Sequence, residues 1–220
     1  MTALILFDFD GTLADTAPDL AAAANRQRTR AGLEPLPLEV LRPHSSAGAR
    51  GLLRCALNLT PADETYEAHR VQFLKDYEAA MMVDTCLFDG VTELLAQIKD
   101  AGMTWGIVTN KATYLATPLV AALGLAKDCV VLVCGDTTAH TKPHPLPLLH
   151  AAKQAGFGVE QCLYVGDDLR DIQAAQAAGM PSIAAAYGYC GPEHPPETWQ
   201  ADHCAYSARD MWPAIKQLMR

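Results

Sequence analysis

The chain has 220 residues, is 50% hydrophobic, and carries a formal net charge of −8 from 17 Lys and Arg against 25 Asp and Glu. This length supports one domain with a large insertion, or two small domains. The acidic balance argues against nucleic-acid binding through a basic patch, and the lack of a run of about 18 apolar residues argues against a transmembrane helix. No basic region followed by a small-residue cleavage site marks a secretory signal.

The first predicted element is a buried strand. The apolar run Leu4 to Phe7 leads directly into Asp8 and Asp10. Residues 16–83 then break the strand pattern, because segments 18–33 and 64–81 have the spacing of amphipathic helices. We therefore predict a helical cap domain of residues 16–83, inserted into a core domain of residues 1–15 and 84–220.

From Met103 onward, strand-like and helix-like segments alternate. The apolar runs "TWGIVTN", "CVVLVCGD", "CLYVGDD" and "SIAAAYG" are separated by helix-like segments at residues 113–123, 146–155 and 169–178. Each helix-like segment is followed by a glycine suited to end a helix. Alternation with fully apolar strands predicts an α/β fold whose parallel sheet is covered on both faces. The Pro-rich segment 187–202 is predicted to be a loop.

Cysteine and histidine usage indicates a reduced, zinc-free protein. The seven cysteines form no C-x-x-C pair, and several lie in apolar runs such as "CVVLVC". This pattern is typical of buried thiols in a reducing cytoplasm, so we predict a cytoplasmic location. The histidines lack the paired spacing of a zinc site. His140, His144 and His150 are expected at the surface or beside the site, not as ligands.

Polar residues gather where the predicted strands end, which is where open α/β sheets bind ligands. The set comprises Asp8, Asp10, Thr109, Asn110, Lys111, Asp136, Lys142, Asp167, Asp168 and Asp171. One strand-end aspartate is readily explained as a helix cap, but several carboxylates with a hydroxyl and a lysine are not. Clustered carboxylates raise one another's pKa. A divalent cation relieves this repulsion, and oxygen ligands favour Mg²⁺.

The same residues carry a resemblance to the haloacid dehalogenase superfamily of phosphohydrolases. "DFDGTLADT" resembles its first motif, "IVTN" its second, "TKPHP" its third and "VGDDLRDI" its fourth, all in order. The resemblance implies a Rossmann-like parallel-sheet core and phosphatase activity. A helical insertion after the first motif resembles the subclass with a small α-helical cap, which includes phosphoglycolate phosphatases.

The resemblance also implies catalytic roles. Asp8 would be the nucleophile that forms an aspartyl-phosphate. Asp10 would protonate the leaving oxygen and then activate water. Asp8, the backbone carbonyl of Asp10, and Asp167 would hold Mg²⁺, while Lys142 would offset the negative charge.

Phosphate binding is implied for the second group of residues. Thr109 and backbone N–H groups near Gly11 and Asn110 would hold the phosphoryl oxygens. Asp171 is expected to orient Lys142 or a metal-bound water. Asp168 stands where many relatives have Ser or Thr.

Substrate selectivity is expected to come from the cap, which closes over the site. In the loop "HSSAGARG", residues 44–51, Ser45, Ser46 and Arg50 could hydrogen-bond a hydroxyl or carboxylate, with Arg42 and Arg54 as weaker candidates. The alternative is that this loop is only a serine-capped helix entry.

Within the subclass, the chain most resembles the N-acetylmuramic acid 6-phosphate phosphatases of cell-wall recycling. The resemblance rests on "WGIVTNK", "VLVCGD", "VGDDLRDI" and "YGYCGPEHPPETWQAD". It implies N-acetylmuramic acid 6-phosphate as the substrate, with 2-phosphoglycolate as the alternative. A sugar-phosphate mutase and a non-enzymatic binding protein are weaker alternatives. The expected partner is a small phosphorylated metabolite, and both monomer and homodimer stay open.

Overall fold

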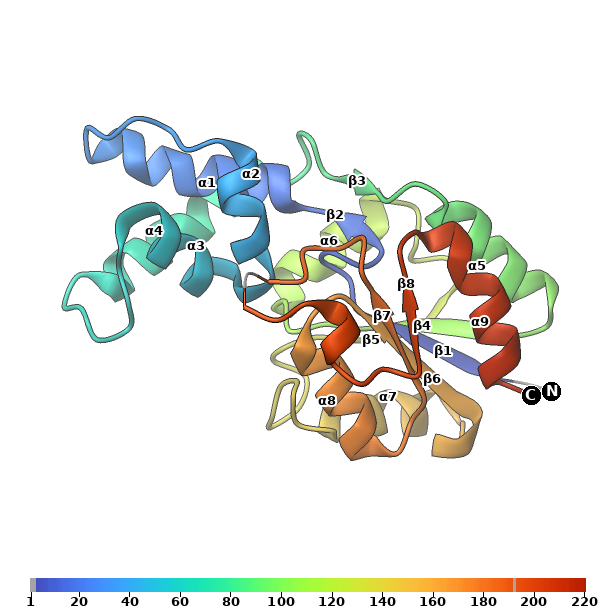
Figure 1. Ribbon diagram of the computed structural model, residues 1–220. Coiled ribbons are helices and arrows are strands. Elements are labelled where there is room, and N and C mark those ends of the chain that lie inside the picture. The colour runs from blue at the N-terminus through green and yellow to red at the C-terminus, as the bar shows by residue number, and fades with distance from the viewer. Residues whose placement is uncertain (1–2, 192) are drawn as a thin grey trace.

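The computed structural model describes residues 3–191 and 193–220, and within them six strands form one parallel sheet flanked by helices (Figure 1). The strand order is β5-β4-β1-β6-β7-β8. The strands are β1 (Leu4–Phe7), β4 (Thr104–Val108), β5 (Cys129–Val133), β6 (Cys162–Gly166), β7 (Ser182–Ala185) and β8 (His203–Ala205). This confirms the predicted α/β fold with a parallel sheet.

Side chains of the central strand alternate between two hydrophobic layers. Ile5 and Phe7 pack with helices on one face, whereas Leu4 and Leu6 pack with helices on the other. The first face is covered by α5 (Val91–Asp100), α6 (Thr113–Ala122) and α9 (Met211–Leu218), and the second by α7 (Leu146–Ala155) and α8 (Leu169–Ala178). All four residues of β1 are buried, so the strand that leads to Asp8 is held from both sides.

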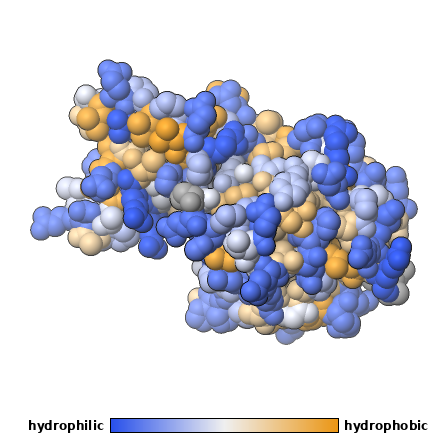
Figure 2. Space-filling view, in the orientation of Figure 1, coloured by the Kyte–Doolittle hydropathy of each residue, from blue (hydrophilic) through white to orange (hydrophobic). Residues whose placement is uncertain are grey.

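The helical insertion has a hydrophobic cluster of its own. Its elements are α1 (Ala17–Arg30), α2 (Leu38–Leu41), the 3₁₀ helix η1 (Arg42–Ala47), α3 (Gly48–Leu57) and α4 (Tyr66–Glu78). Leu20, Phe73 and Tyr77 are buried in this cluster, which Leu115 of α6 also joins. On the face seen in Figure 2, hydrophobic residues gather among hydrophilic ones on this part of the molecule. The predicted insertion of helices is confirmed, while the boundaries at 15/16 and 83/84 stay a prediction.

Two chain crossings connect the insertion to the sheet, and they lie side by side. The short strands β2 (Ala14–Asp15) and β3 (Cys86–Leu87) pair antiparallel. Next to them, the buried carboxylate of Asp19 in the first turn of α1 accepts hydrogen bonds of 3.0–3.2 Å from the backbone N–H groups of residues 83–85. The outgoing and returning segments are therefore fixed to each other.

The C-terminal region contains more regular structure than the sequence predicted. Segment 187–202, apart from residue 192, which lies outside the described residues, holds a single 3₁₀ helix, η3 (Pro196–Thr198). Strand β8 and helix α9 follow this segment and were not predicted. Outside the C-terminal region, helix α5 was not predicted either. None of the helices in the described ranges is long and apolar enough to cross a membrane.

Candidate active site

Three neighbouring strands bring the predicted residues together. Strands β4, β1 and β6 are adjacent in the sheet, and Thr109, Asp8 and Asp167 directly follow them. The backbone N–H of Asp8 still donates to the carbonyl of Val165 at 2.8 Å. The nucleophile candidate thus continues the ladder of the sheet, and its backbone is held rigidly at the carboxyl edge.

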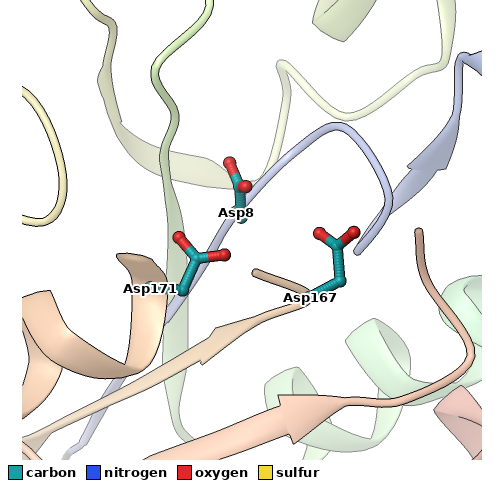
Figure 3. Close-up of side chains that lie close together, drawn as sticks. All are labelled: Asp8, Asp167 and Asp171. Atoms are coloured by element: carbon teal, nitrogen blue, oxygen red, sulfur yellow. The ribbon is translucent and has the colours of Figure 1, made fainter. Parts of the chain in front are cut away.

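Three carboxylates converge at this edge. Asp8, Asp167 and Asp171 each offer an oxygen that lies within 4.8 Å of the other two (Figure 3). Asp167 and Asp171 are both 1% exposed. Burial, followed by repulsion from Asp8 and Asp171, raises the pKa of Asp167 well above its usual range. Burial also raises the pKa of Asp171 to about 7, against the opposing attraction of Lys142. The cluster carries more negative charge than its protein neighbours neutralise.

The backbone around Asp167 approaches so closely that only glycine fits. Gly11 has φ +82°, and a Cβ there would lie 2.1 Å from Asp167 Oδ2. A Cβ on Gly188 would lie 2.3 Å from Asp167 Cβ. Asp167 is further held by the Thr12 hydroxyl at 2.9 Å and the Tyr189 N–H at 2.9 Å. Rigid, oxygen-only donors that repel one another fit a hard divalent cation such as Mg²⁺.

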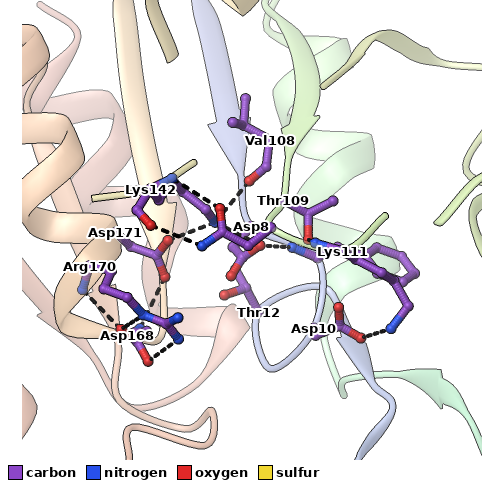
Figure 4. Close-up of polar contacts among 12 residues, drawn as sticks. Asp8, Asp10, Thr12, Val108, Thr109, Lys111, Lys142, Asp168, Arg170 and Asp171 are labelled. Carbon is purple, nitrogen blue, oxygen red and sulfur yellow. Dashed lines mark hydrogen bonds and ion pairs between the residues drawn. The ribbon is translucent and has the colours of Figure 1, made fainter. Parts of the chain in front are cut away.

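Lys142 is the cation that the protein itself supplies to this cluster. Its ammonium lies 2.9 Å from Asp8 Oδ1 and 2.8 Å from Asp171 Oδ1, and it donates to the carbonyl of Val108 at 3.0 Å (Figure 4). Lys142 is 3% exposed. Burial lowers the pKa of Lys142, but the attraction of Asp171 and Asp8 outweighs it and raises the pKa overall. The side chain therefore stays protonated between the two carboxylates.

Asn110 positions the segment that carries Lys142. Its side-chain amide donates to the Lys142 carbonyl and accepts from the Lys142 N–H, both at 3.0 Å. The Thr109 hydroxyl accepts from the Lys111 N–H at 3.2 Å. The second and third motifs are therefore joined by a pair of hydrogen bonds that motif order alone does not predict.

Asp10 faces away from the acidic cluster. Its Oδ1 accepts from the Lys111 ammonium at 2.8 Å (Figure 4). The same oxygen accepts from the Thr16 hydroxyl at 2.5 Å. The ring of Tyr77, from α4 of the insertion, lies 4.7 Å from the Lys111 ammonium. Asp10 is thus connected through Lys111 to the helical insertion, a link that the sequence did not indicate.

Asp168 is the N-cap of α8 and the anchor of an arginine. It accepts from the Arg170 N–H at 2.9 Å, and both its oxygens accept from the Arg170 side chain at 2.8 Å. Arg170 Nη2 also donates to the Ser46 carbonyl of the insertion at 2.8 Å. These contacts account for an aspartate at position 168 without any metal contact.

A cavity of about 380 Å³ lies between the strand ends and the insertion. Its lining includes Asp8, Asp10, Lys142, Thr109, Asn110, Ser45, Ser46, Arg70, Tyr77 and Arg170. The hydroxyls of Ser45 and Ser46 are buried and have no hydrogen-bond partner among the described residues. Both are therefore unpaired polar groups at the wall of this cavity.

Comparison with known proteins assigns the family. Residues 5–185 match the family of haloacid dehalogenase-like hydrolases. This chain belongs to that family. A phosphoglycolate phosphatase from Xanthomonas campestris pv. campestris is 48% identical over 208 residues, covering 94% of each chain. An N-acetylmuramic acid 6-phosphate phosphatase from Pseudomonas aeruginosa is 42% identical, covering 90% of this chain and 88% of that one.

Solved structures agree with this assignment. A protein described as a predicted phosphoglycolate phosphatase from Haemophilus somnus 129PT superimposes with a TM-score of 0.86 at 27% identity, covering 97% of this chain and 98% of the other. This haloacid dehalogenase-like hydrolase is therefore an enzyme, and its relatives are phosphatases.

The residues of this hydrolase that were predicted to bind substrate from the cap lie at two hollows. Ser45 and Ser46 line the cavity that contains Asp8. Arg50 does not; it is exposed and, with Arg54, lines an adjoining hollow of about 700 Å³ that shares Ser46 and Arg170 with the first. Arg70, which the sequence did not single out, lines the cavity with Asp8. Arg42 instead pairs with Asp15 at 2.9 Å, beside the chain crossings.

Proposed function

We propose that this phosphatase uses Mg²⁺ and an aspartyl-phosphate intermediate to hydrolyse a small phosphorylated metabolite. The observation that carries the proposal is the placement of Asp8. Its Oδ1 is occupied by the Phe9 N–H at 2.7 Å and the Lys142 ammonium at 2.9 Å. Its Oδ2 takes no hydrogen bond from the described residues, so this oxygen can attack phosphorus.

The chain's residues divide the two chemical steps between them. Attack by Asp8 forms the bond from oxygen to phosphorus as the bond to the leaving oxygen breaks, and Asp10 gives that oxygen a proton. Asp10 then takes a proton from the water that cleaves the aspartyl-phosphate. Lys142 keeps the Asp8 carboxylate oriented throughout.

Mg²⁺ would be held by Asp8, the backbone carbonyl of Asp10, and Asp167, with Asp171 beside them. When bound, it would supply positive charge against the phosphate and the carboxylates. Thr109 and the N–H groups of Gly11 and Asn110 would hold the phosphoryl oxygens.

The size of the cavity supports N-acetylmuramic acid 6-phosphate as the substrate. A volume of about 380 Å³ lies within the range of sites for ligands larger than a two-carbon acid. The unpaired hydroxyls of Ser45 and Ser46 are suited to a sugar. This reading implies a role in cell-wall recycling in the cytoplasm.

2-Phosphoglycolate is a second candidate because the relatives support it at least as strongly. The proteins that are 48% identical carry the name phosphoglycolate phosphatase, against 40–42% for those named N-acetylmuramic acid 6-phosphate phosphatase. Steady-state kinetics on both compounds with Mg²⁺ decide between them. We expect a higher kcat/KM for the sugar phosphate, and a clear preference for 2-phosphoglycolate would overturn that choice.

A further inference from the structure

Both candidate substrates carry a carboxylate besides the phosphate, and a cationic side chain of the site is needed to bind this carboxylate. Three arginines come into consideration: Arg50, Arg70 and Arg170. Arg50 lines the adjoining hollow and not the cavity with Asp8. Arg70 lines the cavity, but it is 41% exposed and its Nε and Nη2 are bound by Glu67 of the same helix. Among the described residues, neither arginine makes a hydrogen bond or ion pair to the core.

We propose that Arg170 is the specificity-determining residue that binds the substrate carboxylate. This inference rests on the proposed phosphatase function. Arg170 lines the cavity that contains Asp8 and Lys142, at its border with the hollow of Arg50. It stands at the start of α8, one residue before Asp171 of the acidic cluster. Its backbone is therefore fixed by the core, next to the acidic cluster.

The guanidinium of Arg170 is held in place from two sides. Asp168 accepts from Nε and Nη2 at 2.8 Å, and the Ser46 carbonyl accepts from Nη2 at 2.8 Å. A guanidinium has five N–H donors, so these bonds use three of them. The two remaining donors are on Nη1, which has no hydrogen-bond partner in residues 3–191 and 193–220.

This arrangement gives selectivity at low entropic cost. An arginine that is already immobilised loses little rotamer freedom when a carboxylate binds. The same side chain joins the core to the loop of Ser45 and Ser46, so the carboxylate and hydroxyl contacts of a substrate would be set at one place. A phosphate ester without a carboxylate would make only the contacts to its phosphate and hydroxyls.

Matched pairs of substrates separate this role from a general effect on the site. The first pair is N-acetylmuramic acid 6-phosphate and N-acetylglucosamine 6-phosphate, which lacks the lactyl carboxylate. The second is 2-phosphoglycolate and ethyl phosphate. We expect Arg170→Gln to lower kcat/KM for the preferred carboxylate-bearing member by about 10- to 100-fold, the loss of a hydrogen bond to a charged group. The carboxylate-free member should change far less.

Control variants test the choice among the arginines. Arg50→Gln and Arg70→Gln should keep the ratio of kcat/KM within each pair. Arg170→Lys keeps the positive charge, but an ammonium cannot bind Asp168 and a substrate carboxylate at the same time as a planar guanidinium can. This variant should therefore recover only part of the kcat/KM ratio within each pair. The same comparison can be made without turnover. In the inactive Asp8→Asn background, the dissociation constants of both members of each pair are measured with and without Arg170→Gln.

Two outcomes would overturn the proposal. An equal loss on both members of a pair in Arg170→Gln would mean that Arg170 only positions the Ser46 loop. Collapse of the ratio in Arg70→Gln, with Arg170→Gln unchanged, would move the carboxylate site to α4. In either case hydrolysis of an aryl phosphate by the parent enzyme would leave the proposed phosphatase chemistry standing.

Discussion

The pKa of a buried carboxylate in the insertion shifts in the opposite direction to the pKa values of two buried carboxylates in the core. Asp76 of α4 is 8% exposed and accepts hydrogen bonds from Arg30, Gln27 and Gln72. The hydrogen bonds from Arg30 outweigh burial and hold the pKa of Asp76 below its usual value. In the core, the pKa values of Asp167 and Asp171 are raised.

This difference in pKa distinguishes a buried carboxylate that stabilises the fold from buried carboxylates that are suited to bind a ligand. Asp76 has as many donors as it can use, so its charge is stabilised within the protein. The core cluster has Lys142 as its neighbouring cation for three carboxylates. Such uncompensated charge costs stability and persists where a ligand completes it. Four predictions test this contrast, beginning with the largest effect.

The largest effect is expected for Asp8→Asn. The amide keeps the shape of the side chain but cannot attack phosphorus, so kcat should fall by on the order of 10⁴-fold or more. The thermal midpoint should change little, because the variant loses the pair with Lys142 but also relieves the repulsion of Asp167 and Asp171. Aryl phosphate hydrolysis and thermal denaturation measure the two quantities. Retention of a tenth of the activity would refute the assignment of the nucleophile.

Metal removal should abolish turnover. EDTA should eliminate activity and Mg²⁺ should restore it, whereas Ca²⁺, with its larger and looser coordination, should inhibit. Asp167→Ala should weaken the apparent affinity for Mg²⁺ in an activity titration. Asp136→Ala is the matched control, since Asp136 caps Thr113 of α6 and lies outside the cluster. Equal Mg²⁺ titrations in both variants would place the metal elsewhere.

The insertion should respond in the opposite way to loss of an acid. Asp76→Ala removes the acceptor for three side chains, so we expect a loss of about 1–2 kcal/mol in the free energy of unfolding, reduced because Arg30 is half exposed. The control is Glu67→Gln, whose pair with Arg70 is exposed and should leave denaturant unfolding unchanged. An unchanged midpoint in Asp76→Ala would contradict its structural role.

The smallest effect is a difference in pH dependence. Burial raises the pKa of Asp171 to about 7 in the folded, metal-free protein, against about 3.9 in the unfolded chain. The folded state therefore holds the extra proton, and stability in EDTA should fall as the pH rises from 4 to 7. Asp171→Asn should flatten this slope. Asp76 has a lowered pKa, so its contribution is present above pH 3.9 and is lost in stronger acid.

Residues that follow strands were predictable because the topology alone brings them together. Buried apolar runs in alternation predict parallel strands, and the carboxyl ends of adjacent parallel strands share one edge. Asp8, Thr109 and Asp167 were placed correctly at this edge for that reason. Their catalytic roles stay a prediction that the variants above test.

Contacts between distant side chains were not predictable. The pairs Lys111–Asp10 and Arg170–Ser46 join segments that no local pattern relates. Arg50 was proposed for the carboxylate because it belongs to the small-residue loop at 44–51 that also carries Ser45 and Ser46, but each residue of a helix turns by about 100°. The turn from η1 into α3 directs position 50 toward the other hollow. That rotation depends on packing, which the sequence pattern does not specify.

The paired strands β2 and β3 have a consequence for protein engineering. Because Ala14 lies opposite Leu87 and Asp15 opposite Cys86, the chain leaves and re-enters the core at neighbouring backbone positions, about 4.5–5.5 Å apart in an antiparallel pair. A two-residue hairpin turn can span that gap. The two ends of the insertion are thus close together. We expect that the insertion can be removed, or moved to a related protein, with little rearrangement of the sheet.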